Sequence, residues 1–254
     1  MSALTRDRRD AAGRTPGHHT SFGMTGTVDG RDDGERSVSL AAREPVNGWL
    51  SVGGALLALV GLVVLAVAST GRDSWRHTTG ALVFGASALL MFGASALYHM
   101  TPRSRRSGAL RRLDHSMIYV FIAGTYTPVC LIALWNTSLG VALLVAVWTL
   151  AVAGVTQKAL WMRAPRGLST AIYLGLGWIG ILAAPTVLRA TPAACIALLL
   201  AGGIIYTVGA AFYWRKWPRG RPGVFGFHEL WHVCVLAASA THYWAVLGYL
   251  VPLR

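Results

Sequence analysis

Three histidines have the types and spacing needed for metal chemistry. His228 and His232 are four residues apart, so on a helix both imidazoles lie on one face, about 6 Å apart along the axis. His99 follows Ser95 by the same interval. Three neutral imidazoles and a water molecule form a set that suits tetrahedral Zn²⁺, and a nearby carboxylate can orient or deprotonate the water. We therefore expect the three histidines to share zinc, with Asp114 as the carboxylate.

Seven long apolar runs carry these residues. The runs are 49–68, 79–100, 115–134, 139–157, 168–188, 193–213 and 226–251. Each is long enough for a helix that crosses a hydrocarbon core about 30 Å thick. The chain is 54% hydrophobic and only 13% charged, which leaves almost no polar face for a soluble helical protein. We predict an all-α membrane protein, a seven-transmembrane helix bundle in the cell membrane.

Small residues and prolines inside the runs influence how these helices pack. Many of the 29 glycines lie within the runs, which favours close contact between helices. Pro128 and Pro185 also lie inside runs, where membrane helices tolerate kinks. Both features are compatible with closely packed membrane helices.

The basic residues assign the orientation of the bundle. Twelve Lys and Arg residues fall in the segments 101–113, 158–167 and 214–224, on the side of the N-terminus, against four on the other side. The positive-inside rule places the N-terminus in the cytoplasm and the C-terminus outside. The net charge of +13 is thus a topology signal, and we expect no nucleic-acid partner.

The chain divides into a polar tail and a membrane domain. Residues 1–46 have no apolar periodicity and no apolar segment of the signal-peptide kind. We expect them to form a disordered cytoplasmic tail, and residues 47–254 to form the membrane domain.

The predicted topology brings the candidate residues to one depth. The end of the second run and the starts of the third and seventh all face the cytoplasm, so His99 and Asp114 gather with the histidine pair. Ionisable groups at membrane depth are costly and mark functional sites. His242 lies about 15 Å beyond His232, so we expect it to make a separate polar contact. His115 points about 100° away from Asp114 and is a weaker ligand candidate.

The segment His228-Glu229-Leu230-Trp231-His232 also matches the H-E-x-x-H spacing of zinc proteases, in which the glutamate is the general base. In intramembrane metalloproteases the carboxylate ligand usually follows this motif, whereas Leu113-Asp114 precedes it. In the first turn of a helix, Glu229 would instead be stabilised by the helix dipole. An intramembrane metalloprotease is therefore the less favoured alternative.

Over about residues 44–251 the chain resembles the hemolysin III family, the bacterial branch related to the progestin and adipoQ receptors and, more remotely, to alkaline ceramidases. The resemblance rests on Ser95-x-x-x-His99, on Asp114-His115 leading to Ala123-Gly124-Thr125-Tyr126-Thr127-Pro128, and on Phe227-His228-Glu229-Leu230-Trp231-His232. It implies zinc at His99, His228 and His232. It also implies that Asp114 and Ser95 serve the zinc-bound water or its surroundings.

One departure from that family lies in the first span. Members usually open it with Glu-x-x-Asn-x-x-Thr-His, and here Glu44 and Asn47 are followed by Leu50-Ser51 in place of Thr-His. The histidine that is replaced is not among the proposed ligands, so the expected zinc site is unaffected.

Two functions from different classes fit these features. One is a zinc-dependent membrane hydrolase that cleaves a lipid amide or ester, which makes membrane lipids the expected partners and a lipid the expected substrate. The other is a non-enzymatic protein with structural zinc, either a cytolysin-like or channel-like factor or a regulator of membrane homeostasis. Turnover of lipids separates the first from the second.

Overall fold

A computed structural model describes residues 44–72, 74–102, 105–220 and 225–253 of the chain. The regular structure of these residues is helical throughout, and they include seven helical segments long and apolar enough to cross a membrane. The predicted all-α, seven-helix membrane fold is therefore confirmed. The expected tail, apart from residues 44–46, lies outside the described residues, so its disorder stays a prediction.

The helical segments lie close to the predicted apolar runs. They are α1 (Pro45–Thr70), α2 (Trp75–Met100), α3 (Ser107–Pro128) with the π-helix η1 (Val129–Ala133), α4 (Ser138–Leu160), α5 (Arg166–Trp178) with the 3-10 helix η2 (Ile179–Ala183) and α6 (Ala184–Ala190), α7 (Ala193–Arg215), and α8 (Phe227–Ala245) with the π-helix η3 (Val246–Leu250). The largest difference is at α3, which begins well before the apolar run that starts at 115. Arginine is a good helix former, so the helix extends through Arg111 and Arg112, which the sequence places in a loop.

Both internal prolines lie next to irregular helix. Pro128 ends the regular part of α3, and the π-helical turn η1 follows it directly. Pro185 lies in the first turn of α6, immediately after the 3-10 turn η2. Proline removes one backbone donor and disturbs the turn that precedes it, which gives the 3-10 turn η2 before Pro185 a local cause.

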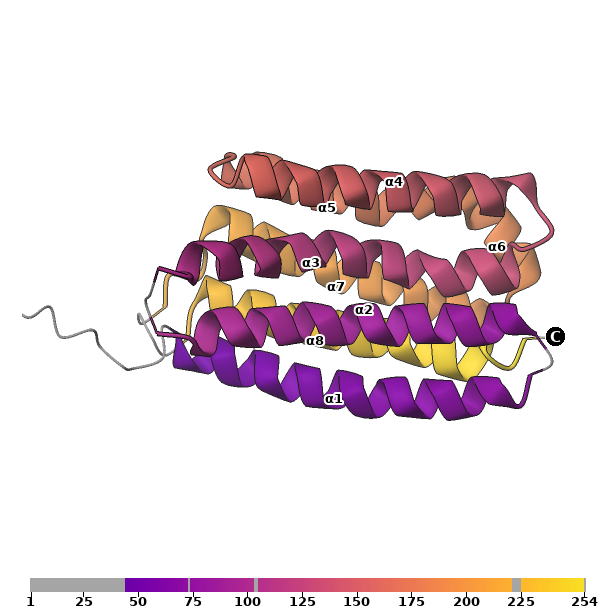
Figure 1. Cartoon of the computed structure of the whole chain (residues 1–254). Helices are drawn as coiled ribbons and strands as arrows, with labels where there is room; N and C mark the ends of the chain where they lie inside the picture. Colours follow the sequence, from indigo (N-terminus) through magenta and orange to yellow (C-terminus); the bar gives the residue numbers. More distant parts are fainter. Residues whose placement is uncertain (1–43, 73, 103–104, 221–224, 254) are drawn as a thin grey trace, which may run out of the picture. The chain divides into compact units, whose positions relative to one another are not determined.

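The helices lie side by side in two rows (Figure 1). One row contains α1, α2, α3 and α4 in chain order, each packed against the next, and α8, α7 and α5 lie behind it. About 56% of the apolar windows of α2 and α3 is buried inside the protein, against 17% for α1. The middle helices of the first row are therefore interior helices, and α1 turns most of its apolar surface outward to where lipid would lie.

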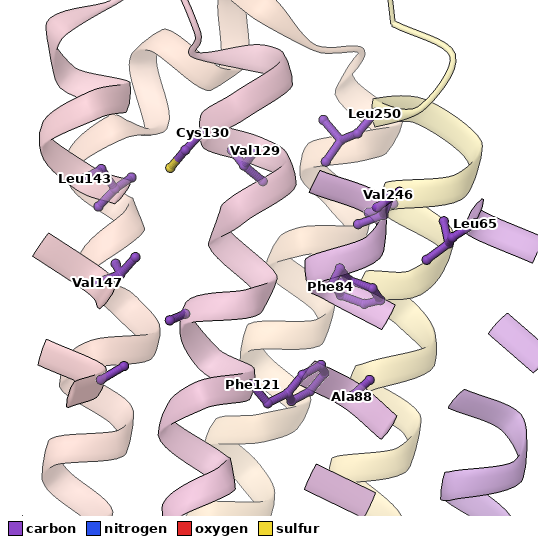
Figure 2. Close-up of a cluster of buried hydrophobic side chains, with 14 of the residues drawn as sticks. Leu65, Phe84, Ala88, Phe121, Val129, Cys130, Leu143, Val147, Val246 and Leu250 are labelled. Carbon is purple, nitrogen blue, oxygen red and sulfur yellow. The ribbon is translucent and has the colours of Figure 1, made fainter. Parts of the chain in front are cut away.

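A buried apolar cluster fixes the middle of the bundle (Figure 2). Phe84 of α2 packs against Phe121 of α3 with ring centroids 5.8 Å apart, and Leu65 and Val246 complete the cluster from α1 and η3. Glycine allows closer contact elsewhere, because a Cβ at Gly124 would collide with a side chain of α2. This packing joins α1, α2, α3 and the η3 end of the last span in the middle of the bundle.

Candidate metal centre

Three histidines from two helices meet at the end of the bundle where α1 begins. His99 lies at the end of α2, and His228 and His232 lie in the first turns of α8. One ring nitrogen of each lies within 4.8 Å of the corresponding nitrogens of the other two. The ring centroids form a triangle with sides of 5.2, 5.1 and 5.0 Å. The structure thus brings together the three residues that the spacing selects.

The cluster has the free nitrogens that a metal needs. Nε2 of His99 and Nε2 of His232 are buried and have no hydrogen-bond partner within the described part of the chain. A buried polar atom without a partner is costly, and a neutral imidazole nitrogen is a common metal ligand. Three imidazoles suit Zn²⁺, and they also suit copper, iron and nickel. The residues present therefore fit a metal ion.

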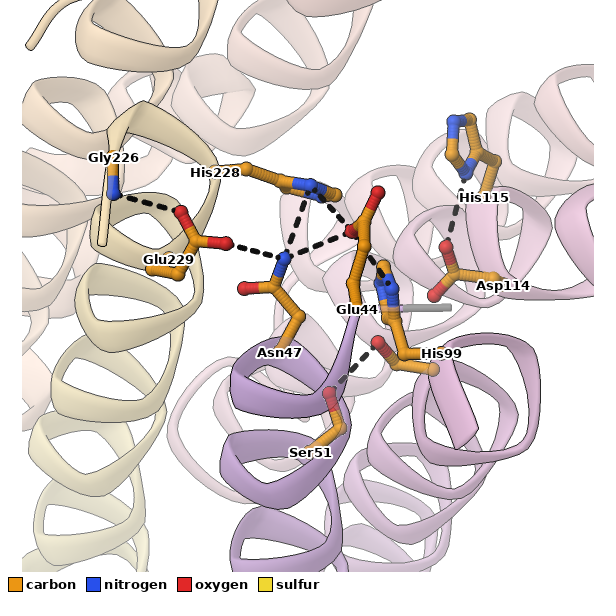
Figure 3. Close-up of polar contacts among 10 residues, drawn as sticks. Glu44, Asn47, Ser51, His99, Asp114, His115, Gly226, His228 and Glu229 are labelled. Carbon is orange, nitrogen blue, oxygen red and sulfur yellow. Dashed lines mark hydrogen bonds and ion pairs between the residues drawn. The ribbon is translucent and has the colours of Figure 1, made fainter. Parts of the chain in front are cut away.

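Glu44 is part of this site, although the sequence analysis did not select it. Its Oε2 lies 3.1 Å from Nδ1 of His99 and 3.0 Å from Nδ1 of His228 (Figure 3). Burial raises the pKa of the Glu44 carboxyl, but contacts with His228 and His99 outweigh burial and hold this pKa below its usual range. A carboxylate that touches the second nitrogen of a ligating histidine fixes the ring and its tautomer.

Asn47 links the start of α1 to the start of α8. Its Nδ2 donates to Glu44 Oε2 at 2.9 Å and to Glu229 Oε1 at 3.0 Å, and it lies 3.3 Å from Nδ1 of His228. The other oxygen of Glu229 accepts the backbone N–H of Gly226 at 2.8 Å, in the first turn of α8. Glu229 thus stabilises the start of its helix, as the dipole interpretation predicts. The spacing Glu44-x-x-Asn47 was the available signal for this network.

Asp114 approaches the histidines from a third helix, α3. The residue is buried, its Oδ2 lies 3.2 Å from Nδ1 of His115, and it is close enough for its charge to act on His99 and His232. His115 is therefore a partner of Asp114 and not a member of the histidine triangle. The backbone carbonyl of His115 in turn accepts the hydroxyl of Tyr173 at 3.2 Å.

Ser95 lies one turn before His99, and its hydroxyl is 3.0 Å from the hydroxyl of Ser51. Both serines are buried. Ser51 stands where the resemblance leads one to expect a histidine, so the departure in the first span places a hydroxyl pair beside the site. Ser95 therefore pairs with Ser51, and it lies on the wall of the adjoining cavity.

A cavity of about 200 Å³ reaches this site from between the helices. Asp114, His228 and His232 line it at the level of the site, and Tyr206 and His242 line it deeper in the membrane. A second cavity of about 160 Å³ shares His242 as a wall, and apolar residues form most of its lining. The two cavities provide an apolar space that leads away from the histidines.

His242 makes the separate polar contact that its distance from His232 predicts. Its Nε2 lies 3.1 Å from the backbone carbonyl oxygen of Leu199 in α7, and its ring packs on Tyr206 at 5.7 Å. The structure therefore keeps it apart from the candidate metal centre.

The fold and the site define an integral membrane protein of seven helices with three clustered histidines at one end of the bundle. Sequence comparison agrees with that class, since the profile of a family described as "Haemolysin-III related" matches residues 40–243. The chain belongs to the haemolysin III family.

Named relatives cover most of the same region. The chain is 39% identical over 199 residues to "Hemolysin-3 homolog" of Bacillus subtilis (strain 168), which covers 78% of this chain and 90% of the relative. It is 36% identical over 200 residues to "Hemolysin-3" of Bacillus cereus, covering 78% and 88%. A more distant match is "Heptahelical transmembrane protein ADIPOR2" of rice (Oryza sativa subsp. japonica), 32% identical over 184 residues and covering 65% and 79%.

Proposed function

We propose that the chain is a zinc-dependent hydrolase that cleaves an amide or ester bond of a membrane lipid. The observation that carries the proposal is the cavity, because Asp114, His228 and His232 open onto an apolar space between membrane helices. A ligand with a polar carbonyl and a long hydrocarbon chain matches that combination. A purely structural metal site does not require an adjoining cavity of this kind.

His99, His228 and His232 would hold the zinc, and Glu44 restrains two of these rings through their Nδ1 atoms. When bound, zinc lowers the pKa of a water molecule to about 7 and polarises a substrate carbonyl. Asn47 keeps Glu44 in place by donating a hydrogen bond to the same oxygen that contacts the histidines. The carboxylate therefore serves to orient the ligands.

Asp114 is the proposed proton carrier. It lies on the cavity wall beside two of the histidines, and its contact with His115 holds its carboxylate in position. In hydrolysis it takes a proton from the attacking water and gives it to the departing oxygen or nitrogen. The carbonyl C–O or C–N bond breaks, and the water oxygen remains in the carboxylate product. Ser95 offers a hydroxyl on the same wall, backed by Ser51.

The metalloprotease alternative has less support. A general base must reach the attacking water, but both carboxylate oxygens of Glu229 are engaged, one with Asn47 and one with the backbone of Gly226. Most of the cavity surface is apolar, which suits a hydrocarbon chain better than a peptide segment with its unsatisfied backbone groups.

A non-enzymatic function with structural metal is the second candidate. It is favoured by the position of the centre, because an ion held by His99 of α2 and His228 of α8, with Glu44 beside it, would fasten three helices together. The printed names of the bacterial relatives refer to hemolysin. A cytolysin-like, channel-like or membrane-homeostasis function would therefore use zinc only for stability.

Metal content and lipid turnover of the purified full chain in nanodiscs test the proposal together. We expect one zinc per chain, and cleavage of at least one member of a panel of lipid amides and esters. Asp114→Asn should keep the metal and lose turnover, His232→Ala should lose both, and the control His77→Ala, at the opposite end of α2, should keep both. Bound zinc without turnover across the panel would overturn the hydrolase, and leakage from proteoliposomes would then favour the second candidate.

A further inference from the structure

Lys158 is a buried cation outside the metal centre. The sequence places it at the start of a cytoplasmic loop, but it lies in the last turn of α4 and its relative exposure is only 2%. A lysine at the end of a membrane helix normally extends its ammonium group to water. Here Nζ donates to Ser169 Oγ of α5 at 2.6 Å and lies 5.7 Å from the centroid of the Tyr173 ring. An ammonium group has three donors, and Ser169 accepts one of them.

No carboxylate in the described part of the chain neutralises this charge. The described residues contain three carboxylates, Glu44, Asp114 and Glu229, and each is engaged around the histidine cluster. Burying a cation without a counter-charge is costly, so such a residue is expected to meet an anion from outside the chain. The position of Lys158 on the cavity wall gives that anion a place to bind.

Two arginines line the same cavity as Lys158. Arg111 of α3 is close enough for its charge to act on Lys158. Arg166 of α5 stacks on the rings of Tyr213 at 4.7 Å and Phe227 at 5.5 Å, which fix the position of its guanidinium. Three cations from three helices therefore line one cavity, although like charges repel when nothing lies between them.

We infer that Lys158, Arg111 and Arg166 bind the phosphate of an anionic phospholipid from the cytoplasmic leaflet. Phosphate oxygens accept hydrogen bonds from both ammonium and guanidinium groups, and a group with more than one acceptor oxygen can engage several donors together. Basic pockets between membrane helices on the cytoplasmic side are a known setting for phospholipid head groups. Inorganic phosphate has the same chemistry, but it would leave the apolar remainder of the cavity unused.

The inferred phosphate position also indicates a class of substrate, and this part of the inference rests on the proposed hydrolase function. Tyr173 connects the two regions, because its ring faces Lys158 and its hydroxyl donates to the carbonyl of His115, next to Asp114. One cavity contains both sets of side chains. A phospholipid held by its phosphate would therefore extend its acyl ester along the wall toward the histidines. The inferred substrate is a glycerophospholipid ester, not a neutral lipid amide.

Equilibrium binding to the full chain carrying Asp114→Asn tests the inference without interference from turnover. The ligands are short-chain phosphatidylglycerol, the diacylglycerol with the same acyl chains, and inorganic phosphate, each measured by calorimetry in detergent. We expect phosphatidylglycerol to bind about tenfold or more tightly than diacylglycerol, since charge-assisted hydrogen bonds distinguish the two. In that background, Lys158→Met should remove about tenfold of the phosphatidylglycerol affinity, and Lys158→Arg should retain most of it.

The chain has its own matched control, because Lys216 is the only other lysine and is exposed. Lys216→Met should leave phosphatidylglycerol binding unchanged. Equal effects of the two lysine variants, or equal binding of diacylglycerol and phosphatidylglycerol, would overturn the inference. Competition by inorganic phosphate at the same concentration as the lipid would assign the site to free phosphate instead. Failure of the hydrolase proposal would appear as absent turnover in the wild type and would leave these binding results untouched.

Discussion

The two ends of α8 both carry partly or fully buried histidines, yet their surroundings differ completely. At the end where α8 begins, the ring of His232 lies 5.1 Å from that of His99 and 5.0 Å from that of His228. Toward the other end, His242 contacts a backbone carbonyl of α7 and the ring of Tyr206. The helix and the residue type are the same, so the difference comes from what the neighbouring helices provide.

This comparison shows that an unpaired nitrogen does not by itself make a metal site. Nε2 of His232 and Nδ1 of His242 are both buried without a hydrogen-bond partner among the described residues. Only His232 has further imidazoles within reach, and only at that end do α1 and α3 add the carboxylates of Glu44 and Asp114. A stable metal site needs several donors at one point, which a lone buried histidine does not supply.

The largest expected effect comes from removing one histidine at each end. His232→Ala should abolish stoichiometric zinc, with an affinity loss beyond the roughly 100-fold typical of outer-shell changes. His242→Ala should leave zinc at one per chain and only lower thermal stability, because it loses a hydrogen bond and leaves a cavity. Elemental analysis and thermal unfolding of the two purified variants measure the contrast. Retained zinc in His232→Ala would contradict the site.

A smaller effect is expected from the carboxylate that touches the ligands. Glu44→Gln keeps the shape of the side chain and removes the charge beside His99 and His228, so zinc affinity should fall roughly 10–100-fold. Competition with a chelator of known affinity measures this change. Glu229→Gln is the matched control, because Glu229 bonds Asn47 and Gly226 and not a histidine. Equal losses in both variants would mean that Glu44 acts only through the packing of α1.

The sequence predicted the fold and the histidine triangle for the same physical reason. The length of each apolar run predicts a membrane helix. Because successive helices alternate in direction, the end of the second helix and the starts of the third and seventh must lie at the same depth. His99, His228 and His232 could therefore be brought together without any knowledge of side-chain contacts. Spacing on α8 then excluded His242 from the group.

Other residues could not be placed from the sequence, because their roles depend on packing. Glu44 lies just before the first apolar run, in a segment interpreted as tail, and only the approach of α1 to α2 and α8 shows its contacts. Lys158 has the sequence context of a loop lysine, and its burial arises from the position of α5 beside α4. Helix periodicity contains no information on either approach.

The smallest expected effect tests whether the contrast between the two ends of α8 depends on the imidazoles alone or on all the polar groups at the end where α8 begins. Ser51→Ala removes one hydroxyl from the buried Ser51–Ser95 pair, so the Ser95 hydroxyl loses a partner at a cost of about 1 kcal/mol in the free energy of unfolding. Zinc stoichiometry should not change, because neither hydroxyl belongs to the histidine triangle. The double variant Ser51→Ala, Ser95→Ala should recover part of the stability, since removing both partners leaves no unpaired group.

A loss of zinc in Ser51→Ala would contradict this account. It would show that Ser51 has a metal-related role at the position where the resemblance leads one to expect histidine, and the boundary of the site would then include α1 beyond Glu44.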